Sequence, residues 1–148
     1  MGQIDFKVGT PKAPSELRRL EEIAKPVQQT RIFIAEPFQY WQKFYRDEIG
    51  RVIGQSNIVI AVNYDQSKKI LAYSPRFSTY IIEPKMPEGF GLAESIRQME
   101  ENSHTVLIVS SDDRLAKKAR EVGFKHVVKK DYKNPASFIE ELKKEIGL

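Results

Sequence analysis

Acidic residues follow several apolar runs of this sequence, and carboxylates are the side chains that hard divalent cations prefer. Glu36 follows the run IFIA, Asp65 lies shortly after NIVIAV, Glu83 ends TYII, and Asp112 and Asp113 come after TVLIV. Carboxylate oxygens can replace part of the water shell of Mg²⁺ or Mn²⁺, and a bound ion of this kind can activate water. Acidic residues at such places also cap the helix that follows, which gives Asp112 and Asp113 an alternative role.

Basic residues are concentrated late in the chain, although the formal charge of the whole chain is only +4. Over residues 114–133 the acidic residues are Glu121 and Asp131, and Lys and Arg are far more frequent. Beside an acidic pocket, such side chains would neutralise the phosphates of RNA or DNA. The alternative is a solvated, lysine-rich helix face. The candidate nucleic-acid contacts are Lys117, Lys118, Arg120, Lys129 and Lys130.

Five apolar runs alternate with helical patterns. The strands and helices that they predict must position the acidic and basic candidate residues. The runs cover residues 31–35, 57–62, 79–82, 105–109 and 125–128, and helices are expected after residue 37 and over about 92–101, 113–122 and 135–146. Strands that are apolar throughout indicate a parallel sheet with helices on both faces. We therefore expect a three-layer, Rossmann-like α/β fold with a mainly parallel five-stranded sheet. In such folds ligands bind beyond the carboxyl ends of the strands.

Length and composition limit the class of protein. The 148 residues fit one domain, and we expect an N-terminal arm with a short helix over residues 1–29, followed by the α/β domain over residues 30–148. The chain has no cysteine, which excludes disulfides, cysteine-ligated metals and thiol catalysis. Its apolar runs are far shorter than the roughly 18 residues of a membrane span. A cytoplasmic protein is expected, and the abundance of Glu and Lys without Cys favours a thermophile.

The chain from residue 79 onward resembles PIN-like and NYN-like nuclease domains, including the YacP-like group. In those families an apolar strand ends in Thr/Ser-x-Asp, a Leu follows three residues later, and a Gly precedes the last strand. Ser110, Asp112, Leu115 and Gly123 fit this pattern within VLIVSSDDRLAKKAREVGFKHVV. The family also has an acidic residue early in the preceding helix, where this chain has Glu94.

The first apolar run departs from this family, which ends it with a metal-binding Asp. Ala35 stands at that position here and Glu36 follows, so either Glu36 substitutes for the Asp or the domain keeps the fold without the activity. The resemblance implies a nucleic-acid-binding, Mg²⁺- or Mn²⁺-dependent ribonuclease. The catalytic and metal ligands that it implies are Asp112, Glu94 and Glu36, with Asp113, Glu83 or Asp65 as auxiliaries.

The competing interpretation is a non-catalytic, Rossmann-like adaptor. Tyr40 and Phe44 fall on the side of the predicted helix opposite to Trp41 and Tyr45, so their rings are expected to be exposed. Exposed aromatic rings either stack on bases or form a contact with a second subunit or a protein partner, and we favour the protein contact. A small-molecule binder at the same edge of the sheet, for example of a nucleotide, is a third possibility.

Overall fold

The computed structural model describes residues 30–74, 76–99 and 104–148, so the predicted arm over residues 1–29 lies outside the described residues. Five strands form one sheet: β1 (Ile32–Ala35), β2 (Ile58–Ala61), β3 (Thr79–Ile82), β4 (Thr105–Ser110) and β5 (His126–Lys129). Every neighbouring pair is parallel. The predicted parallel five-stranded sheet is confirmed, because each predicted apolar run coincides with a strand and all neighbouring strands are parallel.

The strand order is β2-β1-β3-β4-β5, which is the order of flavodoxin-like doubly wound sheets. The chain passes from β1 to β2 on one side and then returns to place β3 on the other side of β1. The connections therefore diverge between β1 and β3, and ligands of doubly wound folds bind beyond the carboxyl ends of the strands at such a switch point. The residues that follow β1 and β3 are the first to consider as a functional site.

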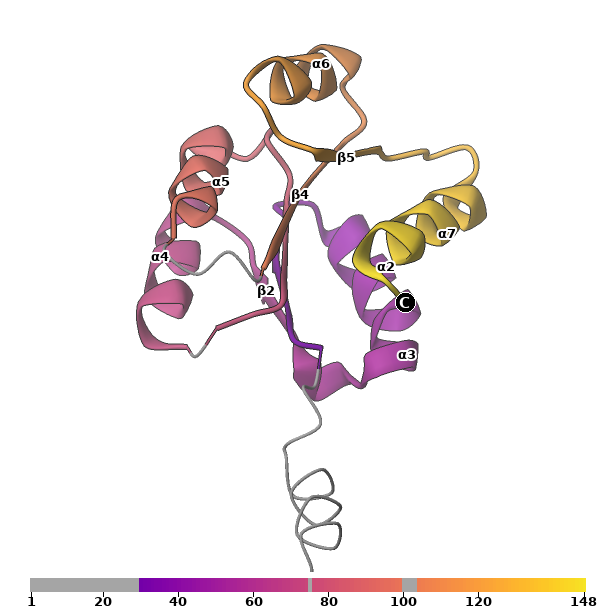
Figure 1. Cartoon of the computed structure of the whole chain (residues 1–148). Helices are drawn as coiled ribbons and strands as arrows, with labels where there is room; N and C mark the ends of the chain where they lie inside the picture. The colour runs from indigo at the N-terminus through magenta and orange to yellow at the C-terminus, as the bar shows by residue number, and fades with distance from the viewer. Residues whose placement is uncertain (1–29, 75, 100–103) are drawn as a thin grey trace, which may run out of the picture.

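The helices lie in two layers, one on each face of the sheet (Figure 1). One layer contains α2 (Gln39–Glu48), the short α3 (Gly50–Ile53) and α7 (Pro135–Ile146), and the other contains α4 (Tyr64–Tyr73), α5 (Gly89–Arg97) and α6 (Asp113–Glu121). A 3-10 turn, η1 (Gln55–Asn57), leads into β2. No helix in the described part of the chain is both long enough and apolar enough to cross a bilayer.

The apolar core has two parts, because successive residues of each strand point to opposite faces of the sheet. Phe33 and Ala35 face the layer of α4, α5 and α6, whereas Ile32 and Ile34 face α2 and α7. Each of these four side chains is fully buried. Full burial of a large apolar side chain contributes roughly 1.5–3 kcal/mol to folding, so both layers are fixed on the sheet by packing.

Two helices differ from the expectations. The sequence pattern predicts no helix after β2, but the structure has α4 there. Its first turn is capped by Asn63, whose Oδ1 accepts a hydrogen bond from the Gln66 N–H (2.8 Å). The helix expected from residue 92 begins at Gly89, directly after the segment that follows β3. Neither difference affects the predicted positions of the five strands.

Candidate functional site

Three charged residues follow β1, β3 and β5 at the carboxyl edge of the sheet. The backbone ladder continues for one residue beyond each strand: the N–H groups of Glu36, Glu83 and Lys130 donate to the carbonyl oxygens of Ala61, Ala35 and Ser110 at 2.9–3.0 Å. The backbone positions of the three side chains are therefore fixed by the sheet. We name Glu36, Glu83 and Lys130 the rim cluster.

The Lys130 ammonium lies between the two carboxylates of the rim cluster. It donates to Glu36 Oε1 and to Glu83 Oε1, the latter at 2.7 Å. The three side chains are only 1–2% exposed. Buried charges of this kind are tolerated when they are paired and hydrogen-bonded, and the rim cluster meets both conditions.

The second oxygen of each carboxylate accepts a backbone hydrogen bond from two residues further along the chain. Phe38 N–H donates to Glu36 Oε2 at 3.2 Å, and Lys85 N–H donates to Glu83 Oε2 at 2.9 Å. A proline follows each glutamate in the sequence. Two Glu-Pro turns of the same design thus present their carboxylates to one lysine.

Burial and charge govern the protonation of this cluster. Burial raises the pKa of Glu36, and the Glu83 charge acts in the same direction, while Lys130 and the Phe38 N–H oppose it. Burial and then the charges of Glu36 and Glu83 raise the pKa of Tyr45 well above its ordinary range, so its hydroxyl keeps its proton. The Lys130 ammonium also lies 5.3 Å from the centroid of the Trp41 ring, within the range of a cation–π contact.

The structure places the other predicted acidic residues in separate local contacts. Asp112 caps α6 by accepting from the Arg114 N–H at 2.9 Å, and this hydrogen bond is the main cause that lowers the pKa of Asp112. Asp113 pairs with Lys129 at 3.0 Å, Glu94 pairs with Arg97 on α5, and Asp65 is exposed in the first turn of α4.

These contacts decide whether the predicted acidic residues can hold a metal ion. No three Asp, Glu or His residues of the described chain form a group that could hold a metal. Glu36 and Glu83 come together, but both already contact the Lys130 ammonium. As they stand, these residues do not fit a resident divalent cation, which would have to replace Lys130 between the carboxylates.

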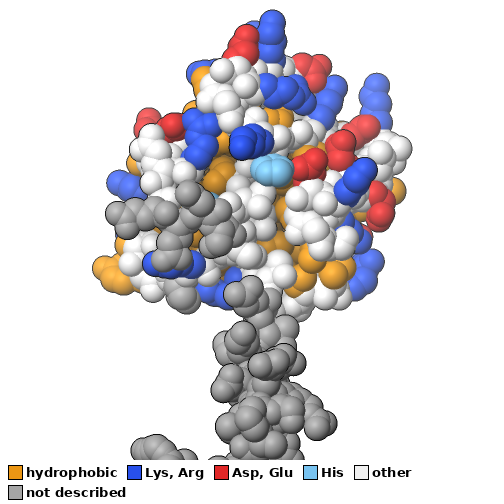
Figure 2. All heavy atoms as spheres, viewed as in Figure 1, with side chains coloured by type: hydrophobic (Ala, Val, Ile, Leu, Met, Phe, Trp, Pro, Cys, Tyr) orange, Lys and Arg blue, Asp and Glu red, His pale blue; other side chains and the backbone are white. Residues whose placement is uncertain are grey.

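The predicted nucleic-acid contacts are also dispersed. Lys130 is buried in the rim cluster, so its prediction as a phosphate contact is wrong. Lys118 lies over the Phe90 ring at 4.9 Å, and Lys129 pairs with Asp113, while Lys117 and Arg120 are exposed on α6. Figure 2 shows acidic side chains among the basic ones at the top of the molecule, where Figure 1 places α6.

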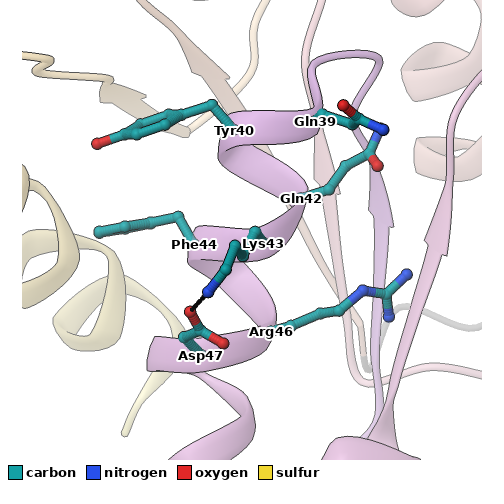
Figure 3. A pocket seen from close by; sticks show the side chains of 7 residues that line it. All are labelled: Gln39, Tyr40, Gln42, Lys43, Phe44, Arg46 and Asp47. Carbon is teal, nitrogen blue, oxygen red and sulfur yellow. Dashed lines mark hydrogen bonds and ion pairs between the residues drawn. The ribbon is translucent and has the colours of Figure 1, made fainter.

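A groove of about 710 Å³ runs along α2, and its described lining comes from residues 39–47 (Figure 3). The Tyr40 ring is 55% exposed, and it lies against Trp41 and Tyr132 at centroid distances of 5.0 and 6.1 Å. Phe44 is half-buried, because it stacks on Phe138 of α7. Figure 3 shows both rings extending from the same side of α2. Both rings contact Trp41, whose ring lies 5.3 Å from the Lys130 ammonium of the rim cluster.

No protein-family model matches the sequence, and no curated protein matches it. Several solved structures that share the fold are receiver domains or response regulators. The signal receiver domain of an HD domain-containing protein from Pseudomonas fluorescens Pf-5 aligns with a TM-score of 0.65 and 15% identity, over 82% of this chain and 89% of that chain. A BeF3-activated DrrB receiver domain aligns with a TM-score of 0.63 and 15% identity, over 82% and 100% of the two chains. A response regulator from Thermotoga maritima gives 0.62 and 16%, over 80% and 99%.

These similarities correct the resemblance to PIN-like and NYN-like nucleases. The fold is that of receiver domains, and the prediction of a nucleic-acid-binding, metal-dependent ribonuclease is wrong. Thr/Ser-x-Asp at the end of a strand and a Gly before the next strand are local features that both folds accommodate. In this chain they serve to cap α6 and to turn the chain into β5.

The sequence predicts Glu83 only as an auxiliary metal ligand and Lys130 as a phosphate contact, whereas the structure pairs these two side chains with each other. A signal was present in the repeated Glu-Pro at the ends of β1 and β3, and in the position of Lys130 at the end of β5, on the same edge of the sheet. Parallel strands carry their carboxyl ends to one edge, so an acid, an acid and a lysine at three strand ends are candidates for one buried cluster.

Proposed function

We propose that this chain is a non-catalytic, receiver-like adaptor that acts by contact with another protein subunit. The observation that carries the proposal is the rim cluster, in which both carboxylates of the switch point are occupied by Lys130. A hydrolytic site of the metal-dependent kind needs carboxylates that are free to hold the ion. Here their oxygens are taken by the ammonium and by two backbone N–H groups.

The contact surface of this adaptor is the α2 groove with Tyr40 and Phe44, and its partner is a second copy of the chain. Tyrosine is enriched at the centre of protein interfaces because it combines a large apolar ring with a polar tip. Tyr40 has more than half of its surface exposed and is held in place by Trp41 and Tyr132. A side chain that is ordered before binding loses little entropy in the contact.

A divalent cation enters this proposal only as a competitor of Lys130. Mg²⁺ or Mn²⁺ would bind the carboxylates of Glu36 and Glu83 when the ammonium withdraws from them. The ammonium itself lies close to the rings of Trp41 on α2 and of Phe38, which precedes α2, at 5.3 and 5.8 Å, so the rim cluster is in contact with the start of this helix.

Sedimentation equilibrium of the full chain tests the contact surface. The wild type is expected to self-associate, and Tyr40→Ala should raise the dimer dissociation constant at least about tenfold, as the loss of a central interface tyrosine does. Tyr73→Ala is the matched control, because Tyr73 is 89% exposed on α4, in the opposite helix layer. A wild type that stays monomeric at its highest soluble concentration, or equal effects of the two substitutions, contradicts self-association through α2.

A further inference from the structure

The only two histidines of the chain line one pocket at the edge of the sheet opposite to the rim cluster. The pocket has a volume of about 360 Å³ and lies where α5 ends and where β4 and β5 begin. Figure 2 shows a histidine side chain at the surface, with a Lys or Arg side chain on one side of it and Asp or Glu side chains on the other. The described lining residues are Arg97, His104, Thr105, Val106, Gly123, Phe124, Lys125 and His126.

Arg97 is held in this pocket from three sides. Its guanidinium lies 4.0 Å from the centroid of the Phe124 ring, donates to the Val122 carbonyl at 3.1 Å and pairs with Glu94. Gly123 lies beside this guanidinium: a Cβ there would be 3.4 Å from Arg97 Nη1, an ordinary contact, whereas its φ of +96° favours glycine. The pocket therefore contains a guanidinium in a fixed position.

Each of the two imidazole rings is oriented by a hydrogen bond from one of its nitrogens. His126 Nδ1 lies 2.9 Å from Glu145 Oε2, and because a carboxylate accepts, Nδ1 donates and Nε2 remains for a ligand. His104 Nε2 donates to the Ile96 carbonyl at 3.0 Å, and its ring packs edge-on against Tyr80 at 5.3 Å. Each ring thus keeps its second nitrogen for another contact.

Lys125 supplies a second permanent positive charge. It is exposed, and within the described chain no side chain pairs with its ammonium. None of the described lining residues is acidic, and the described glutamates Glu94 and Glu145 pair with the lining residues Arg97 and His126. Val106 and Phe124 add a buried apolar floor.

We propose that this pocket binds a small phosphate monoester. Arg presents a fork of N–H donors and Lys a point charge, and both are common partners of phosphate oxygens. The apolar floor of Val106 and Phe124 would take the organic part of the ester. The volume lies near the lower end of the roughly 300–1,000 Å³ that small-molecule sites occupy. This site is separate from the rim cluster and from the α2 groove, and it stands whether or not the adaptor proposal holds.

Proton NMR of the full chain tests this proposal directly, because the two histidine Cε1–H signals both report on the pocket. At constant pH in a buffer without phosphate, phenyl phosphate should shift both signals in a saturable manner. Inorganic phosphate should bind more weakly, since it lacks the apolar part. Lys125→Gln should raise the dissociation constant about two- to fivefold, as the loss of one exposed charge contact does. Lys69→Gln, an equal charge change at an exposed position of α4, should leave it unchanged.

Three results would overturn the proposal. The first is the absence of saturable shifts with phenyl phosphate. The second is an equal weakening by Lys125→Gln and Lys69→Gln, which would mean that net charge alone attracts the ligand. The third is equally tight binding of benzoate, which would show that the pocket selects an aromatic anion and not the phosphate group.

Discussion

The Glu36 carboxylate is buried away from water, and the free energy of unfolding therefore depends on pH through its protonation. Burial raises its pKa above the ordinary value of 4.5, so the folded chain binds this proton more tightly than the unfolded chain. Its contribution to the free energy of unfolding is therefore greatest at acid pH. That contribution is lost as the pH rises from about 4.5 through the pKa in the folded state.

Glu36→Gln removes this titration and keeps a side-chain oxygen that can accept from Lys130. We expect the variant to gain stability relative to the wild type as the pH rises through that window, and the difference to stay constant above it. Urea unfolding of both chains at a series of pH values measures it. A difference that shrinks with rising pH would show that the Lys130 charge, and not burial, dominates the environment of Glu36.

The strand ends that carry Glu36, Glu83 and Lys130 could be located from the sequence, but their shared contact could not. Apolar runs locate strand ends to within a residue, which is sufficient to place an acid at the edge of the sheet. Which side chain becomes buried at this edge of the sheet depends on the backbone path of the residues that follow the strand. Lys129 and Lys130 are neighbours in the sequence, yet Lys129 pairs with Asp113 at the surface and Lys130 is buried.

At the scale of elements, α5 is joined to the rim cluster by a close backbone approach. A Cβ on Gly89 would lie 2.9 Å from both the Glu83 carbonyl oxygen and Pro84 Cα, which are backbone atoms without freedom to move aside. Gly89→Ala should therefore lower the free energy of unfolding by about 1–3 kcal/mol, the usual cost of overpacking.

Gly91 is the control in the same helix, because apart from the adjacent helix backbone no atom of the described residues lies within 4 Å of the Cβ that would be added there. Gly91→Ala should stabilise the chain by roughly 0.5–1 kcal/mol, since alanine loses less backbone entropy in a helix. Opposite signs for the two substitutions in urea unfolding are the expected result. A stabilising Gly89→Ala would show that the segment after Glu83 shifts freely.

The two glycines also explain why the start of α5 could not be predicted. Glycine is a poor helix former, so the stretch GFG indicates a loop, and the helix was expected only from residue 92. Gly89 is needed for the approach to Glu83 and Pro84, which is a tertiary requirement that local propensity does not contain. The helix α4 was missed for a related reason: Ser67 is its only fully buried side chain, so its sequence lacks a strong apolar stripe.

At the scale of the whole molecule, the α/β class could be predicted but the strand order could not. Alternation of apolar runs with helices is common to many doubly wound folds, and it contains no information on which strands are neighbours. The resemblance to nucleases rested on residues 79–148, where strand ends, caps and glycines recur in any such fold. The order β2-β1-β3-β4-β5 brings β1 and β3 together, and this places Glu36 beside Glu83.

The free energy of unfolding and the melting temperature of the whole chain test whether a metal ion and the Lys130 ammonium compete for the carboxylates of Glu36 and Glu83. Lys130→Met should lower the free energy of unfolding by about 3–5 kcal/mol, because it leaves two buried carboxylates without their cation. Lys133→Met, at an exposed position just beyond, should have little effect. Mn²⁺ should then raise the melting temperature of Lys130→Met by mass action, and it should raise that of the wild type much less, where it competes with the ammonium.

The double substitution Lys130→Met with Glu83→Gln identifies the site of this effect. It removes one of the two carboxylates, so the increase in melting temperature with Mn²⁺ should be largely lost, while part of the lost stability returns because the like charges no longer face each other. If Mn²⁺ raises the melting temperature of the wild type and of Lys130→Met equally, the metal binds elsewhere. In that case the ammonium is not its competitor, and the rim cluster is only a structural ion pair.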